Sequence, residues 1–255
     1  MTGSSDGIGQ EAARRLVELG HEVVLHGRNR DRAEQAMRAV PGARTALVGD
    51  LASIQQTREL AAQANAAGPF QTVIHNAGVY RPGGQRRESV DGIEDTFAIN
   101  ALAPYLLTAL VAPPQRLIYL TSGMHQMGDP DLSDLQGRQG RWNGSQAYAN
   151  SKLFITALAF AVARMWPKVL SNAVDPGVVP TKMGGRFAPG NLQEGAATQV
   201  WLAISDEPGA KASGRYFYHM RTRPALAAAS DLTVQDGFLA ACERLTGVKL
   251  PSTAQ

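Results

Sequence analysis

Short apolar segments alternate with amphipathic segments along most of this chain. Apolar segments of four or five residues predict strands at 22–26, 44–48, 72–75, 116–120, 170–174 and 215–219. Apolar residues three or four apart predict helices between them, at 10–20, from 31, and at 54–67, 91–111, 148–163 and 195–204. A parallel connection has to cross over its sheet, usually through a helix. The alternation therefore predicts an α/β fold with a parallel sheet covered on both faces.

Composition narrows the class of protein. Hydrophobic residues make up 44% of the 255 residues and charged residues 18%, as in a globular chain. No repeat, low-complexity tract or linker interrupts the pattern, so we predict one domain over residues 1–255. The net charge is only +3, and the basic residues, twenty of them arginine, are scattered. Such a distribution does not favour nucleic acid as a partner.

Cysteine content and hydropathy bear on the cellular compartment. Cys242 is the single cysteine, which rules out an internal disulfide and fits a reducing cytoplasm. We expect it to pack in a C-terminal helix. No Cys/His cluster has the spacing of a metal site. The longest uncharged apolar stretch, 153–163, has 11 residues, too few to span a bilayer, and the chain opens on a glycine loop rather than a signal peptide.

The first residues form a glycine loop that leads into a helix. Gly3, Gly7 and Gly9 are spaced G-x-x-x-G-x-G before the predicted helix at 10–20. Glycine lets the backbone approach a pyrophosphate closely, and the N-terminus of the next helix favours its charge. A plain tight turn is the alternative interpretation.

A nucleotide-binding glycine loop normally follows a strand, but only Met1 precedes Thr2. That strand would lie centrally in a doubly wound sheet, so its absence would leave backbone groups of two neighbours unpaired. We therefore expect the usual first strand to be missing or truncated, with Met1 at or near its end. Another segment filling the gap is the alternative.

Tyr148 and Lys152 are four residues apart at the head of an apolar helical run, so their side chains share one face. A cation near a phenol favours the phenolate and lowers its pKa from about 10 toward neutral pH. The pair would then donate and accept protons. Spacing alone does not separate this reading from a chance pairing.

Six motifs in order resemble the short-chain dehydrogenase/reductase family. The family's opening Thr-Gly-x-x-x-Gly-Ile-Gly is matched at residues 2–9, with Ile8 in place. The others are Asn76-Ala77-Gly78, Asn100, a serine after the next strand, Tyr148-x-x-x-Lys152 and Pro176-Gly177. The resemblance implies a Rossmann-type doubly wound fold, with a cofactor half at about 1–120 and a catalytic and substrate half at about 121–255.

Within that family the chain is similar to the retinol-dehydrogenase-like and protochlorophyllide-reductase-like branch. The similar segments are Asp91-Gly92-Ile93-Glu94, residues 97–100 and 106–108, residues 171–179, and the long spacing before Tyr148. Cys242 does not resemble the active-site cysteine of a true protochlorophyllide reductase, so we do not expect that activity.

The resemblance also implies roles at the catalytic site. Ser122 would polarise a carbonyl oxygen, Tyr148 would protonate it, and Lys152 would bind the nicotinamide ribose and acidify Tyr148. Asn100 would help to hold a water that leads protons to Lys152. Ser122 could instead simply end a strand, and Thr121 is then the other candidate for the catalytic hydroxyl. Asn100 could be a buried amide with a structural role only.

The residues after the second strand bear on the cofactor. No acidic residue precedes Asp31, and Arg28 can pair with a 2′-phosphate, so we predict NADP(H) over NAD. Asp6, where many NADP-preferring relatives carry a basic residue, points the other way, and Arg28 could merely be solvated. Asp50-Leu51 resembles the pair that contacts adenine, although Asp50 could cap a helix. The full predicted cofactor set is Gly3, Ser5, Asp6, Gly7, Ile8, Gly9, Arg28, Asn29, Asp50, Leu51, Asn76, Ala77, Gly78, Tyr148, Lys152, Pro176, Gly177, Val179 and Thr181.

The long loop at 123–147 should lie over the substrate. We expect Met124, His125 and Trp142 to line the substrate pocket. A Ser122–His125 hydrolase is disfavoured, because no G-x-S-x-G elbow surrounds the serine. The family commonly forms dimers or tetramers through its long helices; apolar residues 154, 158 and 162 would serve such an interface or the core.

The predicted function is an NADP(H)-dependent oxidoreductase, a carbonyl reductase that interconverts an alcohol and a ketone or aldehyde. The alternative is a cofactor-binding sensor or scaffold on the same fold, without turnover. We expect a small-molecule substrate, a homodimer or homotetramer, and no metal, nucleic acid or membrane span.

Overall fold

The strands form two parallel-rich sheets. A computed structural model describes residues 1–185 and 187–253. In it β1 (Val24–Gly27) pairs with β2 (Thr45–Val48), in parallel. A five-stranded sheet has the order β3-β4-β5-β6-β7. Its strands are β3 (Thr72–His75), β4 (Arg116–Leu120), β5 (Leu170–Asp175), β6 (Arg215–Tyr218) and the antiparallel β7 (Arg221–Arg223). Each predicted strand is present, and β7 is a further strand that the sequence did not predict.

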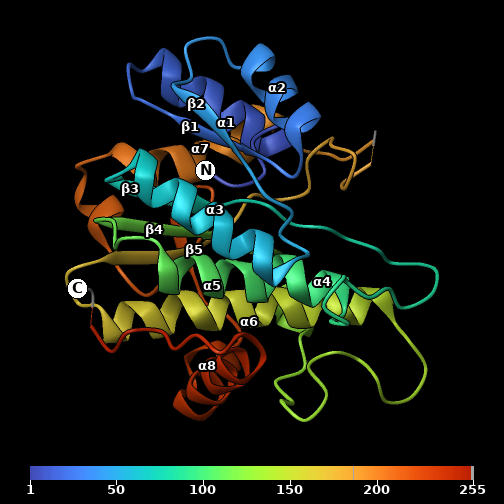
Figure 1. Ribbon diagram of the computed structural model, residues 1–255. Coiled ribbons are helices and arrows are strands. Elements are labelled where there is room, and N and C mark those ends of the chain that lie inside the picture. Colours follow the sequence, from blue (N-terminus) through green and yellow to red (C-terminus); the bar gives the residue numbers. More distant parts are fainter. Residues whose placement is uncertain (186, 254–255) are drawn as a thin grey trace.

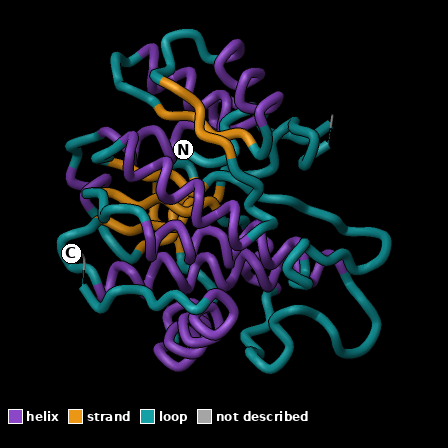
Figure 2. The backbone as a smooth tube through the Cα atoms, viewed as in Figure 1, coloured by secondary structure: helices purple, strands orange, loops and turns teal. Residues whose placement is uncertain are grey.

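Helices cover both faces of the five-stranded sheet (Figure 1). α1 (Gly7–Glu18) and α7 (Leu192–Ile204) pack together on one face, and α5 (Ala103–Leu110) and α6 (Gly144–Met165) cover the other. Around them lie α2 (Arg30–Ala39) against β1, α3 (Ile54–Ala67) against α5, and α8 (Leu232–Thr246) against α6. The long loops after β3 and β4 project from the same side of the molecule (Figure 2). This arrangement confirms the predicted Rossmann-type fold.

The apolar stripe of α6 lies in the core. Phe154, Leu158 and Val162 are almost completely buried against the sheet and α8 within this chain. They are therefore core residues rather than a surface left for a second copy. Cys242 is buried in α8, as expected.

The helix predicted at 91–111 is broken into three parts. α4 (Asp95–Phe97) begins after Glu94, whose carboxylate accepts from the backbone N–H groups of Thr96 and Phe97. A π-helical turn, Ala98–Leu102, separates α4 from α5. Pro104 stands at the start of α5, where its missing N–H removes an i to i−4 hydrogen bond. The wider turn carries Asn100, and π turns of this kind are frequent at functional sites.

No strand precedes α1 in the part of the chain that the structure describes. Met1 and Thr2 stand between β1 and β3: the Met1 ammonium donates to Val24 O at 2.9 Å, and Thr2 N donates to Ile74 O at 3.0 Å. β1 and β3 do not pair with each other, and a cavity of about 510 Å³ lies between them.

Buried side chains of β1 and of the loop itself fix the position of the glycine loop. His26 Nδ1 accepts from Gly3 N at 3.0 Å, and its Nε2 donates to Gly49 O at 2.8 Å. The Ser4 hydroxyl accepts from His26 N at 2.8 Å. Burial lowers the pKa of His26 to about 4, so the ring is neutral and can accept from Gly3.

Gly27 allows α2 to approach the end of β1. A Cβ on this residue would lie 2.3 Å from Ala33 N and 2.7 Å from Arg32 C, both backbone atoms that cannot turn aside. Substituting Gly27→Ala should therefore lower the free energy of unfolding by about 1–3 kcal/mol. Urea denaturation measures the change. Gly83→Ala, at a position with open space around it, is the control and should stay within about 0.5 kcal/mol of the parent.

Protonation of His26 should make stability depend on pH. The unfolded chain takes up this proton near the ordinary pKa of 6.5 and the folded chain only near about 4, so stability falls as pH drops through this range. The share from His26 is about 2 kcal/mol between about pH 7.5 and pH 5. His26→Asn keeps an acceptor and does not titrate. Urea melts at both pH values should show a smaller pH effect in the variant; an equal effect would contradict this role.

Candidate active site

A groove of about 490 Å³ follows the carboxyl ends of the strands. Most of the residues predicted to bind the cofactor line it, and they come from the glycine loop, the ends of β1 to β4, α6 and the segment after β5. These are Gly3, Ser5, Asp6, Gly7, Ile8, Gly9, Arg28, Asp50, Leu51, Asn76, Ala77, Gly78, Tyr148, Lys152, Pro176 and Thr181. Ligands of open α/β sheets bind at this edge.

The glycine loop packs tightly on the segment after β3. A Cβ on Gly9 would lie 2.3 Å from Gly3 O and from Asn76 Nδ2. The Asn76 amide donates to Thr2 O and Gly3 O at 3.1 and 3.0 Å, and the Thr2 hydroxyl accepts from Asn76 N and Ala77 N. The backbone is therefore bare and rigid where a pyrophosphate would approach, so these residues fit a dinucleotide.

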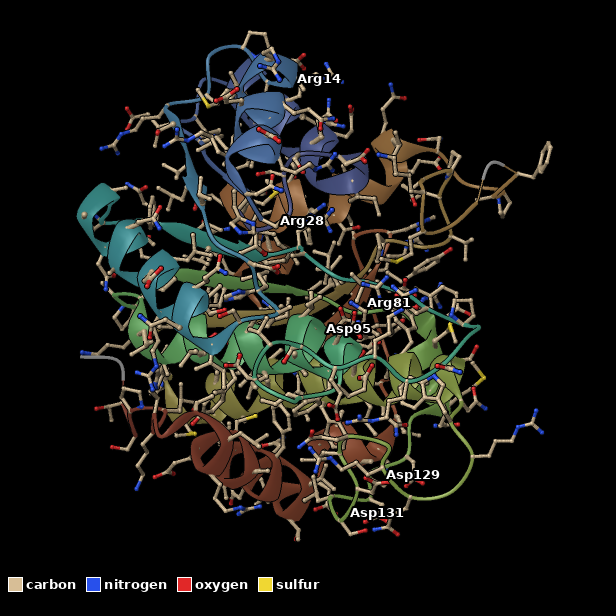
Figure 3. All side chains as sticks on the ribbon, turned by 45° about the vertical axis from the view of Figure 1, so that its right-hand side comes forward. Arg14, Arg28, Arg81, Asp95, Asp129 and Asp131 are labelled. Carbon is tan, nitrogen blue, oxygen red and sulfur yellow. The ribbon has the colours of Figure 1, made fainter. Side chains whose placement is uncertain are left out.

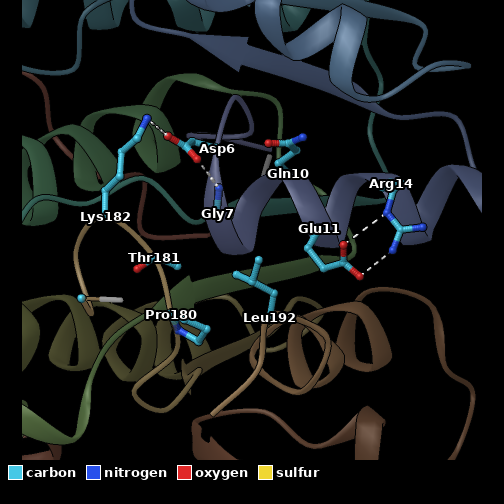
Figure 4. A pocket seen from close by; sticks show the side chains of 10 residues that line it. Asp6, Gly7, Gln10, Glu11, Arg14, Pro180, Thr181, Lys182 and Leu192 are labelled. Atoms are coloured by element: carbon cyan, nitrogen blue, oxygen red, sulfur yellow. Dashed lines mark hydrogen bonds and ion pairs between the residues drawn. The ribbon is translucent and has the colours of Figure 1, made fainter. Parts of the chain in front are cut away.

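Asp6 lies at the N-terminus of α1 among cations. Its carboxylate accepts from Gly7 N at 2.9 Å and pairs with Lys182 (Figure 4). It also pairs with Arg32. The hydrogen bond from Lys182 is the main reason that the pKa of Asp6 is lowered. A second cavity of about 600 Å³ lies beyond this pair, between α1 and the segment 180–192. Sequence reasoning missed Lys182 and Arg32, because nothing local links residues so far apart in the chain.

Other cofactor candidates have clear local positions. Arg28 is exposed at the groove between the β1–β2 sheet and the rest of the molecule (Figure 3). Asn29 caps α2 by accepting from Arg32 N at 3.0 Å, and it does not line the groove. Ser53, not Asp50, caps α3. Val179, in the segment after β5, is buried and packs against Gly195.

Lys152 is buried at the end of β4. Its Nζ donates to Leu120 O at 2.9 Å and lies 5.5 Å from the centre of the Tyr148 ring. Burial lowers the pKa of Lys152 to about 8, while the charge of Asp175 opposes that change. Lys152 therefore remains largely an ammonium at neutral pH.

The pKa of Tyr148 is shifted upward, opposite to the direction expected from its pairing with Lys152. Burial raises the pKa of Tyr148 to about 12, against a hydrogen bond with the Ser122 side chain that lowers it. The Lys152 ammonium is directed to the Leu120 carbonyl rather than to the phenol oxygen, so it does not offset the desolvation. At neutral pH Tyr148 is thus a neutral phenol that holds a proton to donate.

Ser122 and Thr121 follow β4 and differ in availability. Ser122 caps the 3-10 turn Gly123–Met127 by accepting from Met124 N at 3.2 Å. Its side chain also lowers the pKa of Tyr148. The Thr121 hydroxyl is buried, donates to Lys152 O and accepts from Thr156. Of the two hydroxyls, Ser122 is the one that influences the pKa of Tyr148.

Asn100 is held wholly by protein groups. Its amide donates to Val79 O at 2.9 Å and to the Ser151 hydroxyl at 3.0 Å, and its Oδ1 accepts from Val79 N at 2.8 Å. A Cβ on Gly78 would lie 3.3 Å from both Asn100 Oδ1 and Lys152 Nζ. Asn100 and Lys152 therefore meet across Gly78.

His125 is not on the wall of the groove, contrary to expectation. It is fully buried; its Nδ1 donates to Ser122 O at 2.7 Å, and its Nε2 accepts from Leu226 N at 3.2 Å. Trp142 packs on Gly137 within the long loop, and neither it nor Met124 lines the groove. The local sequence could not reveal that Leu226, a hundred residues away, binds the ring.

Two other side chains cover Tyr148 instead. The Tyr80 ring lies 4.7 Å from the Tyr148 ring, and the Tyr148 hydroxyl is 3.8 Å from Met183 Sδ. Next to them Arg81 pairs with Asp95 through two nitrogens (Figure 3). Tyr80 and Met183 lie in irregular loops, where no hydrophobic period marks a pocket residue.

No helix among the described residues is long and apolar enough to cross a membrane. The same residues contain no group of three His, Cys, Asp or Glu side chains that could hold a metal ion.

Comparison with known proteins identifies the family. A model of the short chain dehydrogenase family matches residues 1–191. The chain is 41% identical to short-chain dehydrogenase chry4 of Gibberella zeae, covering 99% of this chain and 98% of that protein. It is 30% identical to human retinol dehydrogenase 13, covering 100% and 86%. A crystal structure of a protein from Mycobacterium Paratuberculosis superposes with a TM-score of 0.83 at 25% identity, covering 98% and 93%. The chain thus belongs to the short-chain dehydrogenase/reductase family, in its retinol-dehydrogenase-like branch, and is an oxidoreductase that uses a nicotinamide dinucleotide.

Proposed function

We propose that this protein is an NADP(H)-dependent oxidoreductase that interconverts an alcohol and a ketone or aldehyde. The observation that carries the proposal is one continuous groove, with Arg28 and the glycine loop at one end and Tyr148 and Lys152 at the other. The name of retinol dehydrogenase 13 indicates an alcohol substrate for that relative.

NADPH, when bound, supplies the hydride for the carbonyl carbon. Tyr148 gives its phenolic proton to the carbonyl oxygen, and its raised pKa keeps that proton in place until charge develops. The Ser122 hydroxyl, which lowers the pKa of Tyr148, polarises the same oxygen. Lys152 holds the ribose and returns the proton through the region of Asn100, which it meets across Gly78.

The electrostatics of the groove favour NADP over NAD. Arg28 is exposed at the groove and has no ion pair with any residue that the structure describes, and Arg32 lies in the first turn of α2. From the sequence alone, the negative charge of Asp6 argued against NADP. In the structure Lys182 and Arg32 offset that charge. A 2′-phosphate would therefore meet net positive charge.

The substrate side of the groove suggests an apolar carbonyl compound. Tyr80 and Met183 cover the Tyr148 hydroxyl with an aromatic ring and a thioether. Asn100, Ser122, Tyr148 and Lys152 are all present at the site, which argues against the alternative of a sensor without turnover. Function as one domain, a homodimer or homotetramer, and a cytoplasmic location stay predictions from the sequence.

Substituting Arg28→Asp should weaken NADPH binding by about 100-fold, because a charged, bidentate contact is replaced by repulsion. NADH binding should change far less. Fluorescence titration of both cofactors measures the two affinities. Arg38→Asp, at the exposed far end of α2, is the control and should leave both unchanged. Equal losses for NADPH and NADH in Arg28→Asp would refute the assignment.

Substituting Tyr148→Phe should lower kcat for carbonyl reduction by about 10²–10⁴-fold, since the proton donor is lost while the ring and its packing stay. NADPH affinity and the thermal midpoint should remain close to those of the parent. Loss of NADPH absorbance with a panel of aldehydes and ketones measures the rate. An active Tyr148→Phe enzyme would rule out this residue as the proton donor.

A further inference from the structure

Asp175 is a buried carboxylate that the proposed reaction does not use. It is the last residue of β5, comes directly before Pro176-Gly177, and is 8% exposed. Its Oδ1 accepts from Gly177 N at 2.9 Å, and its Oδ2 accepts from the Tyr216 hydroxyl at 2.9 Å. A buried carboxylate is costly unless nearby groups compensate its charge.

The groups around Asp175 are those of the active site. A Cβ on Gly123, the residue after Ser122, would lie 3.2 Å from Asp175 Oδ2, so the carboxylate lies against the turn that Ser122 begins. The charge of Asp175 raises the pKa values of both Lys152 and Tyr148. The other titratable side chains that face this cluster are His125, Tyr216, Tyr218 and Tyr80.

A chain of contacts runs from Asp175 to Ser122. The Tyr216 hydroxyl binds the carboxylate, and the Tyr216 ring lies 4.6 Å from the His125 ring. His125 donates to Ser122 O at 2.7 Å. Direct contacts therefore connect Asp175 to Ser122, whose side chain lowers the pKa of Tyr148.

Resting on the function proposed above, we propose that Asp175 is a positioning residue of this active site. Its negative charge keeps Lys152 an ammonium and Tyr148 a neutral phenol, and through Tyr216 and His125 it fixes Ser122. A negative charge favours a nearby cation and disfavours a nearby phenolate. The site is thereby set to donate a proton at neutral pH, the direction of carbonyl reduction.

Two variants separate the charge of Asp175 from its contacts. Asp175→Asn removes the charge but can still accept from Gly177 N and donate to the Tyr216 oxygen. Tyr216→Phe keeps the charge and breaks the link toward His125 and Ser122. Asp175→Glu restores the charge and serves as the rescue variant.

Competitive acetylation with acetic anhydride, read by mass spectrometry, reports the state of Lys152 without turnover. The exposed Lys168 in the same molecule is the internal reference. In Asp175→Asn, labelling of Lys152 relative to Lys168 at about pH 7 should rise about fivefold, as a one-unit fall from a pKa of about 8 requires. Tyr216→Phe and Asp175→Glu should label like the parent.

The pH profile of alcohol oxidation with NADP⁺ gives the second readout. Its rising limb should move to lower pH in Asp175→Asn, because the phenol then ionises more easily. In Tyr216→Phe the profile should stay in place while the rate of carbonyl reduction falls. Unchanged Lys152 labelling and an unshifted profile in Asp175→Asn would overturn the proposal. A protein with no oxidoreductase activity would refute the proposed function, yet the labelling experiment would still decide the role of Asp175.

Discussion

The structure depends on one buried ammonium. Lys152 is 4% exposed, on the longest helix, at the point where β4 ends. A charge removed from water is destabilising unless nearby groups compensate it. Here the Leu120 carbonyl, the face of the Tyr148 ring and the charge of Asp175 do so. Since these groups come from β4, α6 and β5, the charge is stable only when the three elements are aligned.

The same alignment builds the rest of the site. β4 and β5 pair in parallel from Arg116 with Leu170 to Leu120 with Val174, so Ser122 and Asp175 emerge at one edge. The π turn before α5 brings Asn100 to the other side of Gly78 from Lys152. The glycine loop, on the cofactor side of the site, does not depend on this alignment. The neutral His26 ring and the Asn76 amide fix it, and no strand precedes it among the described residues.

Local pattern was enough to predict the strands, the glycine loop and the face shared by Tyr148 and Lys152, because these features depend on spacing along the chain. It failed where the deciding partner lies far away. His125 was expected at the substrate, but Ser122 O and Leu226 N bind both ring nitrogens. The pKa of Tyr148 was expected to fall, but burial raises it. Lys182, which pairs with Asp6, lies 176 residues further along the chain and had no local signature.

The reaction proposed for this groove is hydride transfer from the nicotinamide cofactor to a carbonyl carbon. Reduction of a ketone with NADPH deuterated at both positions of the nicotinamide C4 tests it most directly. We predict one deuterium on the carbinol carbon of the product, seen by mass spectrometry, at a rate that depends on Tyr148. Product that carries only solvent hydrogen at that carbon, or deuterium that stays entirely on the cofactor, would contradict it.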